Sequence, residues 1–131
     1  MKIFITGVAG FLGSHLADLM ISEGHTVAGN DNMIGGYTDN VPQDVEFHQV
    51  DCCDLENMTK AMEGCDIVYH TAATAYEGLS VFSPVLVARN IFEASVTTIT
   101  AAIRNKVKRI VYCSSMARYG HHDEMPYKET Y

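Results

Sequence analysis

The sequence predicts an α/β fold in which a doubly wound parallel sheet is flanked by helices within one domain of 131 residues. Short runs rich in β-branched and aromatic residues alternate along the chain with segments of helical periodicity. A glycine-rich turn follows the first of these runs, and no internal repeat or low-complexity linker divides the chain. A chain of this length is expected to form one hydrophobic core.

The first strand, turn and helix open the chain. Residues 2–6 form a β-branched and aromatic run that stops at a glycine. Apolar residues then recur at helical spacing from Phe11 to Met20, and Gly24 ends this pattern. Residues 25–30 have the composition of a second strand, so a βαβ unit is complete in about thirty residues.

The alternation continues through the middle of the chain. Turn-forming residues fill positions 31–44, which we expect to be a loop. The expected third strand is 45–49, and Asp54 can cap a helix that ends near Gly64. A fourth strand is expected at 67–70.

A long amphipathic helix and a fifth strand complete the expected fold. Apolar residues recur at helical spacing over 83–105, and Pro84 lies in the first turn, where no amide donor is lost. Residues 107–113 are the expected fifth strand. Right-handed crossovers between parallel strands then give an open sheet.

The turn after the first strand carries the clearest functional signal. It reads Gly-Val-Ala-Gly-Phe-Leu-Gly, a GxxGxxG pattern. We expect Gly7 to permit the tight turn, Gly10 to leave room for a pyrophosphate, and Gly13 to let the helix pack close to the sheet. Amides at the helix N-terminus would then face the phosphates. The alternative is a strand-to-helix turn with incidental glycines.

An acidic residue supports a dinucleotide site. Asp31 follows the second strand about twenty residues beyond the turn, where a ribose-binding acid belongs. A carboxylate accepts hydrogen bonds from both ribose hydroxyls and repels a 2′-phosphate, so Asp31 favours NAD over NADP. No Arg or Lys lies between Lys2 and Lys60 to neutralise such a phosphate. The sequence therefore predicts a Rossmann-type NAD-binding domain.

Landmarks of a known family follow one another along nearly the whole chain: TGVAGFLGSHL, GHTVAGNDN, VDCCDL, DIVYHTAA and RIVYCSSMARYG. Together they resemble the NAD-dependent epimerase/dehydratase family, the extended short-chain dehydrogenases/reductases, and most of all its UDP-sugar 4-epimerases. The resemblance implies an enzyme that acts by transient hydride transfer to NAD on a nucleotide sugar. Sugar-nucleotide dehydratases and reductases of the same family remain alternatives.

The resemblance also implies roles for particular residues. Asp31 and Asn32 would contact the adenosine ribose. Asp51 and Cys52 would lie beside the adenine, and Asn90 occupies the place of an asparagine in the family's long helix. Because Glu93-Ala94 stand where the family has Gly-Thr, a solvated or interface helix face is the alternative for Asn90. The predicted cofactor-binding residues are Gly7, Gly10, Phe11, Leu12, Gly13, Asp31, Asn32, Asp51, Cys52, Thr71, Ala72, Ala73 and Asn90.

Ser115 aligns with the catalytic serine of the family, judged from Tyr119-Gly120 just after it. In the family this hydroxyl hydrogen-bonds the substrate oxygen and assists a tyrosine acid/base. The alternative is that Ser114 and Ser115 only cap a turn. Three polar residues that follow are expected to be solvated in a loop: His121, His122 and Asp123.

The tyrosine–lysine pair of the family does not occur in this sequence. In that pair a lysine four residues after the tyrosine lowers the pKa of the phenol. No tyrosine here has a lysine four positions on, and the adjacent Tyr127 and Lys128 cannot replace the pair. We therefore expect the N-terminal part of a longer enzyme, with the last strand and the C-terminal substrate lobe beyond Tyr131. A short non-catalytic dinucleotide-binding sensor or subunit is the alternative.

Composition limits the partners. A net charge of −7 and a pI near 5.2 argue against nucleic acid and anionic membranes. No apolar run approaches the ~20 residues of a membrane-spanning helix, and the N-terminus lacks the features of a signal peptide, so we expect a cytoplasmic protein. The family's habit implies a homodimer through the long helices. The cysteines lack the spacing of zinc sites and are expected to be reduced, small apolar side chains: Cys52, Cys53, Cys65 and Cys113.

Overall fold

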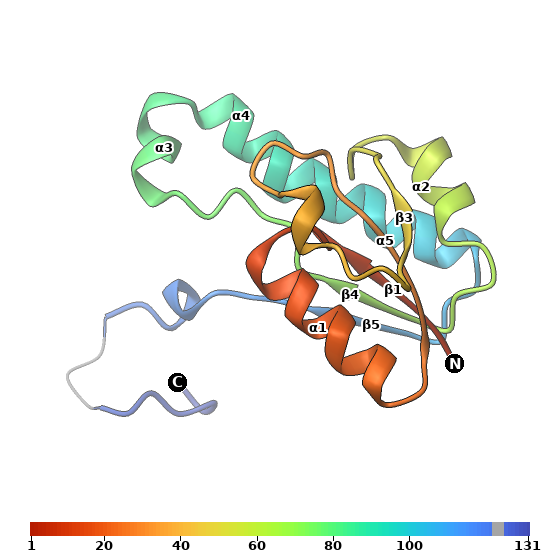
Figure 1. Cartoon of the computed structure of the whole chain (residues 1–131). Coiled ribbons are helices and arrows are strands. Elements are labelled where there is room, and N and C mark those ends of the chain that lie inside the picture. The colour runs from red at the N-terminus through yellow and green to blue at the C-terminus, as the bar shows by residue number, and fades with distance from the viewer. Residues whose placement is uncertain (122–124) are drawn as a thin grey trace.

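A five-stranded parallel sheet forms the centre of the structure, a computed structural model that describes residues 1–121 and 125–131 (Figure 1). The strand order is β3-β2-β1-β4-β5, so the chain winds outward from β1 in one direction and then in the other. The doubly wound sheet predicted from the sequence is therefore confirmed. The strands are β1 (Lys2–Thr6), β2 (Thr26–Asn30), β3 (Glu46–His48), β4 (Ile67–His70) and β5 (Arg109–Tyr112).

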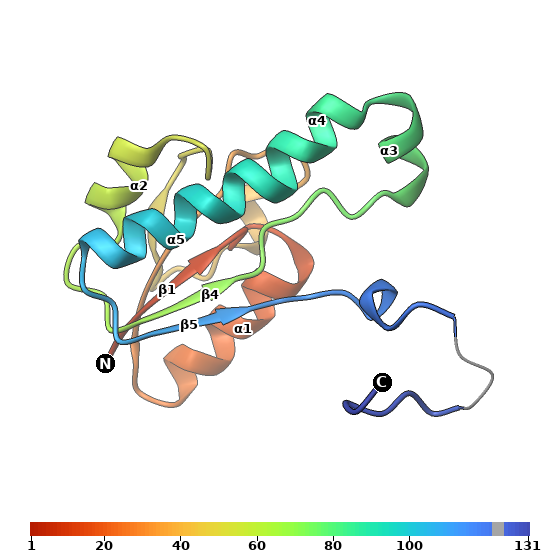
Figure 2. The same cartoon turned by 180° about the vertical axis from the view of Figure 1, so that it is seen from behind.

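Helices cover both faces of the sheet, because successive side chains of a strand point to opposite sides. Ile3 and Ile5 of β1 join a buried cluster with α1 (Phe11–Ser22), whereas Phe4 between them joins a cluster on the other face. That second cluster contains residues of α2 (Leu55–Ala61) and α5 (Ala94–Arg104). Figures 1 and 2 show α1 on one side of the sheet and α2 and α5 on the other.

Several local predictions are confirmed. Asp54 caps α2, its Oδ1 accepting a hydrogen bond from the Asn57 amide at 3.1 Å. Residues 31–44 form a loop as expected, with one short 3-10 turn, η1 (Thr38–Asn40). The strands β2, β3 and β5 are each shorter than predicted by one to three residues, all lost at their ends.

The predicted long helix over 83–105 is interrupted. It consists of α4 (Pro84–Ala88), a π-helical segment η2 (Arg89–Glu93) and α5. A π-helical segment adds one residue to a turn, and periodicity alone does not reveal it. Besides η1, the short elements α3 (Glu77–Phe82) and the 3-10 turn η3 (Met116–Tyr119) were not predicted. Both are too short to establish a helical repeat.

The apolar residues that suggested the long helix do not form its packed face. The buried residues of α5 are small: Ala94, Thr98, Ala101 and Ala102. The larger side chains lie mostly outside, Phe92 being 73% and Ile103 70% exposed. The apolar stripe that suggested the helix is therefore largely uncovered by the rest of the described chain.

The cysteines differ in environment. Cys52 and Cys65 are buried and Cys53 is half-buried, as small apolar residues should be, but Cys113 at the end of β5 is exposed. No helix among the described residues is long and apolar enough to span a membrane. His121 is exposed, whereas His122 and Asp123, for which we expected a solvated loop, lie outside the described residues.

Candidate functional site

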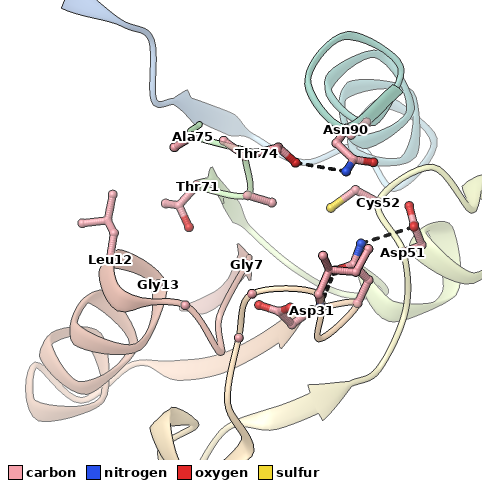
Figure 3. A pocket seen from close by; sticks show the side chains of 18 of the residues that line it. Gly7, Leu12, Gly13, Asp31, Asp51, Cys52, Thr71, Thr74, Ala75 and Asn90 are labelled. Atoms are coloured by element: carbon pink, nitrogen blue, oxygen red, sulfur yellow. Dashed lines mark hydrogen bonds between the residues drawn. The ribbon is translucent and has the colours of Figure 1, made fainter. Parts of the chain in front are cut away.

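A cavity of about 450 Å³ opens at the carboxyl ends of β1, β2 and β4 (Figure 3). The strand order reverses here, and ligands of doubly wound folds bind at this point. Every residue predicted to bind the cofactor lines this cavity: Gly7, Gly10, Phe11, Leu12, Gly13, Asp31, Asn32, Asp51, Cys52, Thr71, Ala72, Ala73 and Asn90. The prediction also missed lining residues, among them Gly36, Thr74, Tyr76 and Leu79.

The glycine turn forms the floor of the cavity. Gly7 has φ +69°, and a Cβ there would lie 2.9 Å from the Ala72 Cα. A Cβ on Gly13 would overlap the Gly7 carbonyl oxygen and lie 2.8 Å from the Val8 Cα. Gly13 therefore allows α1 to approach the turn itself, rather than the sheet strands as we expected. Both positions require glycine for a steric reason.

The N-terminus of α1 points its free amides toward the cavity. Gly10 is the N-cap and has no side chain to cap the helix, and the first turn contains no acidic residue. The amides of the first helical turn have no partner within a helix, so those of Phe11 and Leu12 are open to a ligand. Their orientation and the helix dipole suit an anion.

Asp31 is 8% exposed and holds the glycine turn in place. Its Oδ2 accepts from the Ala9 amide at 3.2 Å, and its Oδ1 accepts from the Met33 amide at 2.8 Å. Each carboxylate oxygen has two acceptor positions, so one on each oxygen remains for a ligand. The loop of residues 31–44 also folds over the glycine turn, since Tyr37 N and Asn40 Nδ2 both donate to the Ala9 carbonyl. Sequence spacing found Asp31 but not this loop contact.

A polar network surrounds the opposite wall. Asp51 Oδ2 accepts from Asn32 Nδ2 at 3.3 Å and from Arg89 Nη1 at 3.0 Å. Burial raises the pKa of Asp51, but hydrogen bonds from the Cys53 amide, Arg89 and Asn32 outweigh it and hold the pKa below its usual range. Asn90 Nδ2 donates to Thr74 Oγ1 at 3.0 Å (Figure 3). Asn90 therefore faces the cavity.

A buried chain of hydrogen bonds supports the wall after β4. His70 Nδ1 lies 2.8 Å from Thr6 Oγ1, and His70 Nε2 lies 3.0 Å from Ser95 Oγ. Ser95 donates its only proton to the Ile91 carbonyl, so His70 must donate from Nε2 and accept from Thr6 at Nδ1. Burial lowers the pKa of His70 and so favours the neutral form of the ring. These hydrogen bonds could not be predicted from sequence patterns, because Thr6, His70 and Ser95 are far apart along the chain.

The Thr6 hydroxyl also fixes the start of the segment that lines the cavity. It accepts hydrogen bonds from the amides of Thr71 and Ala72, each at 3.1 Å. These contacts bring Ala72 against Gly7, where a side chain on the glycine would not fit. The residues that line the cavity directly after β4 are therefore small and lie close to the glycine turn: Thr71, Ala72 and Ala73.

Ser115 does not line the cavity. It is exposed and is the N-cap of η3, its Oγ accepting from the Ala117 amide at 3.1 Å. This is the turn-capping arrangement that the sequence left open as an alternative. The hydroxyl retains its one proton for donation to a further partner. The segment after β5 runs past the end of the sheet (Figure 2).

Comparisons with known proteins agree with this geometry. A model of the NAD-dependent epimerase/dehydratase family matches residues 3–131. A probable UDP-arabinose 4-epimerase of Arabidopsis thaliana is 32% identical over 97% of the chain, and a UDP-glucose 4-epimerase of Caenorhabditis elegans is 32% identical over 98%. The chain spans 34% and 42% of the length of these two relatives.

Solved structures of UDP-glucose 4-epimerases are also similar to this chain. The UDP-glucose 4-epimerase of Thermus thermophilus, in complex with NAD, superposes with a TM-score of 0.93 and 34% identity over 99% of this chain. The enzyme of Brucella ovis, also in complex with NAD, gives a TM-score of 0.93 with 30% identity over 98%. The chain corresponds to 43% and 40% of these proteins.

Proposed function

The chain belongs to the NAD-dependent epimerase/dehydratase family, and we propose that it is the NAD-binding part of a UDP-sugar 4-epimerase. The observation that carries this proposal is the cavity that unites the glycine turn, Asp31 and the small residues after β4 at the switch point of the sheet. A dinucleotide binds at this position in a doubly wound fold. In this proposal the activity would belong to a longer protein, of which residues 1–131 would form the NAD-binding domain.

The residues around the cavity fit NAD along its length. The amides of Phe11 and Leu12 would hold the diphosphate above Gly10, where no side chain intervenes. Asp31 has one acceptor position left on each oxygen for the ribose hydroxyls. Of the described residues that line the cavity, none is Lys or Arg and two are Asp, which supports NAD over NADP.

When bound, NAD would accept a hydride from a sugar carbon and return it. In this proposal the Ser115 hydroxyl donates a hydrogen bond to the sugar oxygen on that carbon. The proton that this oxygen loses with the hydride would pass to the tyrosine acid/base of the family, which in this proposal lies beyond residues 1–131. Its position just beyond β5, the strand beside β4, supports that role. The other residues bind and orient: Asp31 and Asn32 the ribose, Asp51 and Cys52 the adenine, and Thr71, Ala72 and Ala73 the remainder of the dinucleotide.

The partners follow from the same assignment. The substrate would be a nucleotide sugar, and the enzyme would act in the cytoplasm. We propose a homodimer that associates through the outer face of α4, η2 and α5. The exposed side chains of Phe92 and Ile103 support this association, because large apolar patches mark interfaces.

Isothermal titration calorimetry of the purified chain with NAD tests the proposal. Saturable binding that is tighter for NAD than for NADP is expected. A folded chain, judged by circular dichroism, that gives no saturable heat would refute the cofactor assignment. Activity is tested on the protein encoded by the complete reading frame, by following interconversion of UDP-glucose and UDP-galactose and of the corresponding UDP-pentoses.

A second candidate is a dinucleotide-binding sensor or subunit without catalysis. The observation in its favour is the lack of a tyrosine with a lysine four residues later in this sequence. The nucleotide sequence beyond codon 131 distinguishes the two candidates. A Tyr-x-x-x-Lys segment downstream supports the epimerase, whereas a stop codon at that point supports the sensor.

A further inference from the structure

Arg89 lies where two separate parts of the cavity wall meet. It is the first residue of the π-helical segment η2, and its Nη1 donates both to Asp51 Oδ2 at 3.0 Å and to Asn90 Oδ1 at 3.2 Å. Asp51 belongs to the loop after β3, and Asn90 in turn donates to Thr74 after β4. One guanidinium therefore joins the loop after β3 to the segment after β4.

The backbone reinforces this junction. The Cys53 thiol lies 3.5 Å from the Arg89 carbonyl oxygen and donates to it, so the loop after β3 is held through a side chain and through the main chain. Burial raises the pKa of Cys53 to about 11, so this thiol stays protonated and can donate. Glu93, on the same segment, is a further charged group beside Arg89.

The hydrogen bonds that the carboxylate of Asp51 accepts from the described residues leave one of its acceptor positions open to a ligand. Its Oδ2 already accepts from Asn32 and Arg89, which fills both acceptor positions of that oxygen. Its Oδ1 accepts one backbone hydrogen bond from the described residues, that of the Cys53 amide at 2.8 Å. A donor on a ligand is thus directed to Oδ1, and the hydrogen bond from Arg89 fixes the orientation of that carboxylate.

From this geometry we propose that Arg89 is a positioning residue of the NAD site, which orients Asp51 toward the amino group of the adenine and fixes the amide of Asn90. The proposal rests on the proposed NAD site and adds a residue that no contiguous motif reveals. Arg89 does not itself line the cavity, so it acts through its two neighbours. An adenine donor is favoured at Asp51, and a purine with an oxygen in place of the amino group is disfavoured.

The experiment measures by calorimetry how three variants bind two dinucleotides. One is NAD, and the other is nicotinamide hypoxanthine dinucleotide, which carries an oxygen in place of the amino group of the adenine. Arg89→Met keeps the length of the side chain without the donors, and Arg89→Lys restores a charge with different geometry. Arg104→Met is the matched control, because Arg104 lies in α5, pairs with Glu56 and is similarly exposed, but is not near the cavity.

Arg89→Met is expected to bind NAD about tenfold more weakly, the size typical of one lost charge-assisted hydrogen bond. It should also lose the preference for NAD over the hypoxanthine analogue, with partial recovery in Arg89→Lys and no change in Arg104→Met. Unchanged affinity and preference in Arg89→Met would overturn the proposal. An equal loss for both dinucleotides would overturn it too, since it would indicate only a general structural effect.

A second measurement needs no ligand and separates this proposal from the proposed function. Carboxyl ¹³C NMR follows the titration of Asp51 in the free chain, and its pKa should rise in Arg89→Met but not in Arg104→Met. An unchanged pKa of Asp51 in Arg89→Met would refute the role proposed for Arg89, even if the chain binds NAD. Failure of the wild-type chain to bind NAD would instead refute the proposed function, whatever the Asp51 titration shows.

Discussion

Replacing Gly13 by alanine is expected to destabilise the protein, although alanine normally favours a helix over glycine by about 1 kcal/mol. A Cβ at this position would overlap the Gly7 carbonyl oxygen and come within 2.8 Å of the Gly7 carbonyl carbon and of the Val8 Cα. These are backbone atoms of a turn that is held to Asn30 by two amide hydrogen bonds, of 2.8 and 3.1 Å. The turn and α1 must therefore separate to admit the methyl group.

Inserting one methylene-sized group into a packed region typically costs about 1 to 3 kcal/mol, and more where only backbone can move. After the gain in helix propensity, we expect Gly13→Ala to lower the free energy of unfolding by about 2 kcal/mol. Urea unfolding followed by circular dichroism should show a midpoint lower by about 1 M. NAD affinity should fall with it, because the first-turn amides of α1 would be displaced.

The control is Gly78→Ala in α3, another helical glycine. A Cβ there meets nothing within 4 Å, so the variant should be as stable as the wild type or slightly more stable. Equal midpoints for the wild type and Gly13→Ala would refute the steric argument. Equal losses in both alanine variants would also contradict it, since they would indicate that the glycine contact is not the cause.

Other changes test the remaining parts of the structure. Asp31→Ala should reduce the preference for NAD over NADP about tenfold or more in competition binding, because the repulsive carboxylate is gone; an unchanged ratio would disprove its role. Since burial lowers the pKa of His70, the unfolded chain takes up a proton near the ordinary value of 6.5 that the folded chain does not. The free energy of unfolding should thus fall as the pH decreases below about 6.5, and His70→Phe should lack that contribution. Phe4→Ala should cost about 3 to 5 kcal/mol, whereas Phe92→Ala on the outer helix face should change the stability of the monomer, measured at a concentration too low for dimerisation, by less than about 0.5 kcal/mol; comparable losses would show that this face is packed within the monomer.

Local patterns predicted most of the fold. The bounds of β1 and β4 match the prediction residue for residue, and Asp54 caps α2 as expected, because strand composition and helix capping act over a few neighbouring residues. The glycine turn and Asp31 were found for the same reason, since their spacing follows from one βαβ unit. The family resemblance supplied the residues from the other loops.

The features that the sequence did not reveal depend on distant contacts. Arg89 meets Asp51 across thirty-eight positions, and Thr6 meets His70 across sixty-four. No periodicity connects such residues. The π-helical segment was not predicted either. The apolar stripe of the long helix is largely exposed, because periodicity identifies an apolar helix face but does not show what covers it.

The central claim is that NAD occupies the cavity at the carboxyl ends of β1, β2 and β4. A ¹H–¹⁵N NMR titration of this 14.4 kDa chain with NAD tests it most directly. Binding of NAD in this cavity should give saturable shifts concentrated in the glycine turn, at Asp31 and Asn32, and at Thr71 to Ala73. An absence of saturable shifts, or shifts confined to the outer face around Phe92 and Ile99, would contradict it.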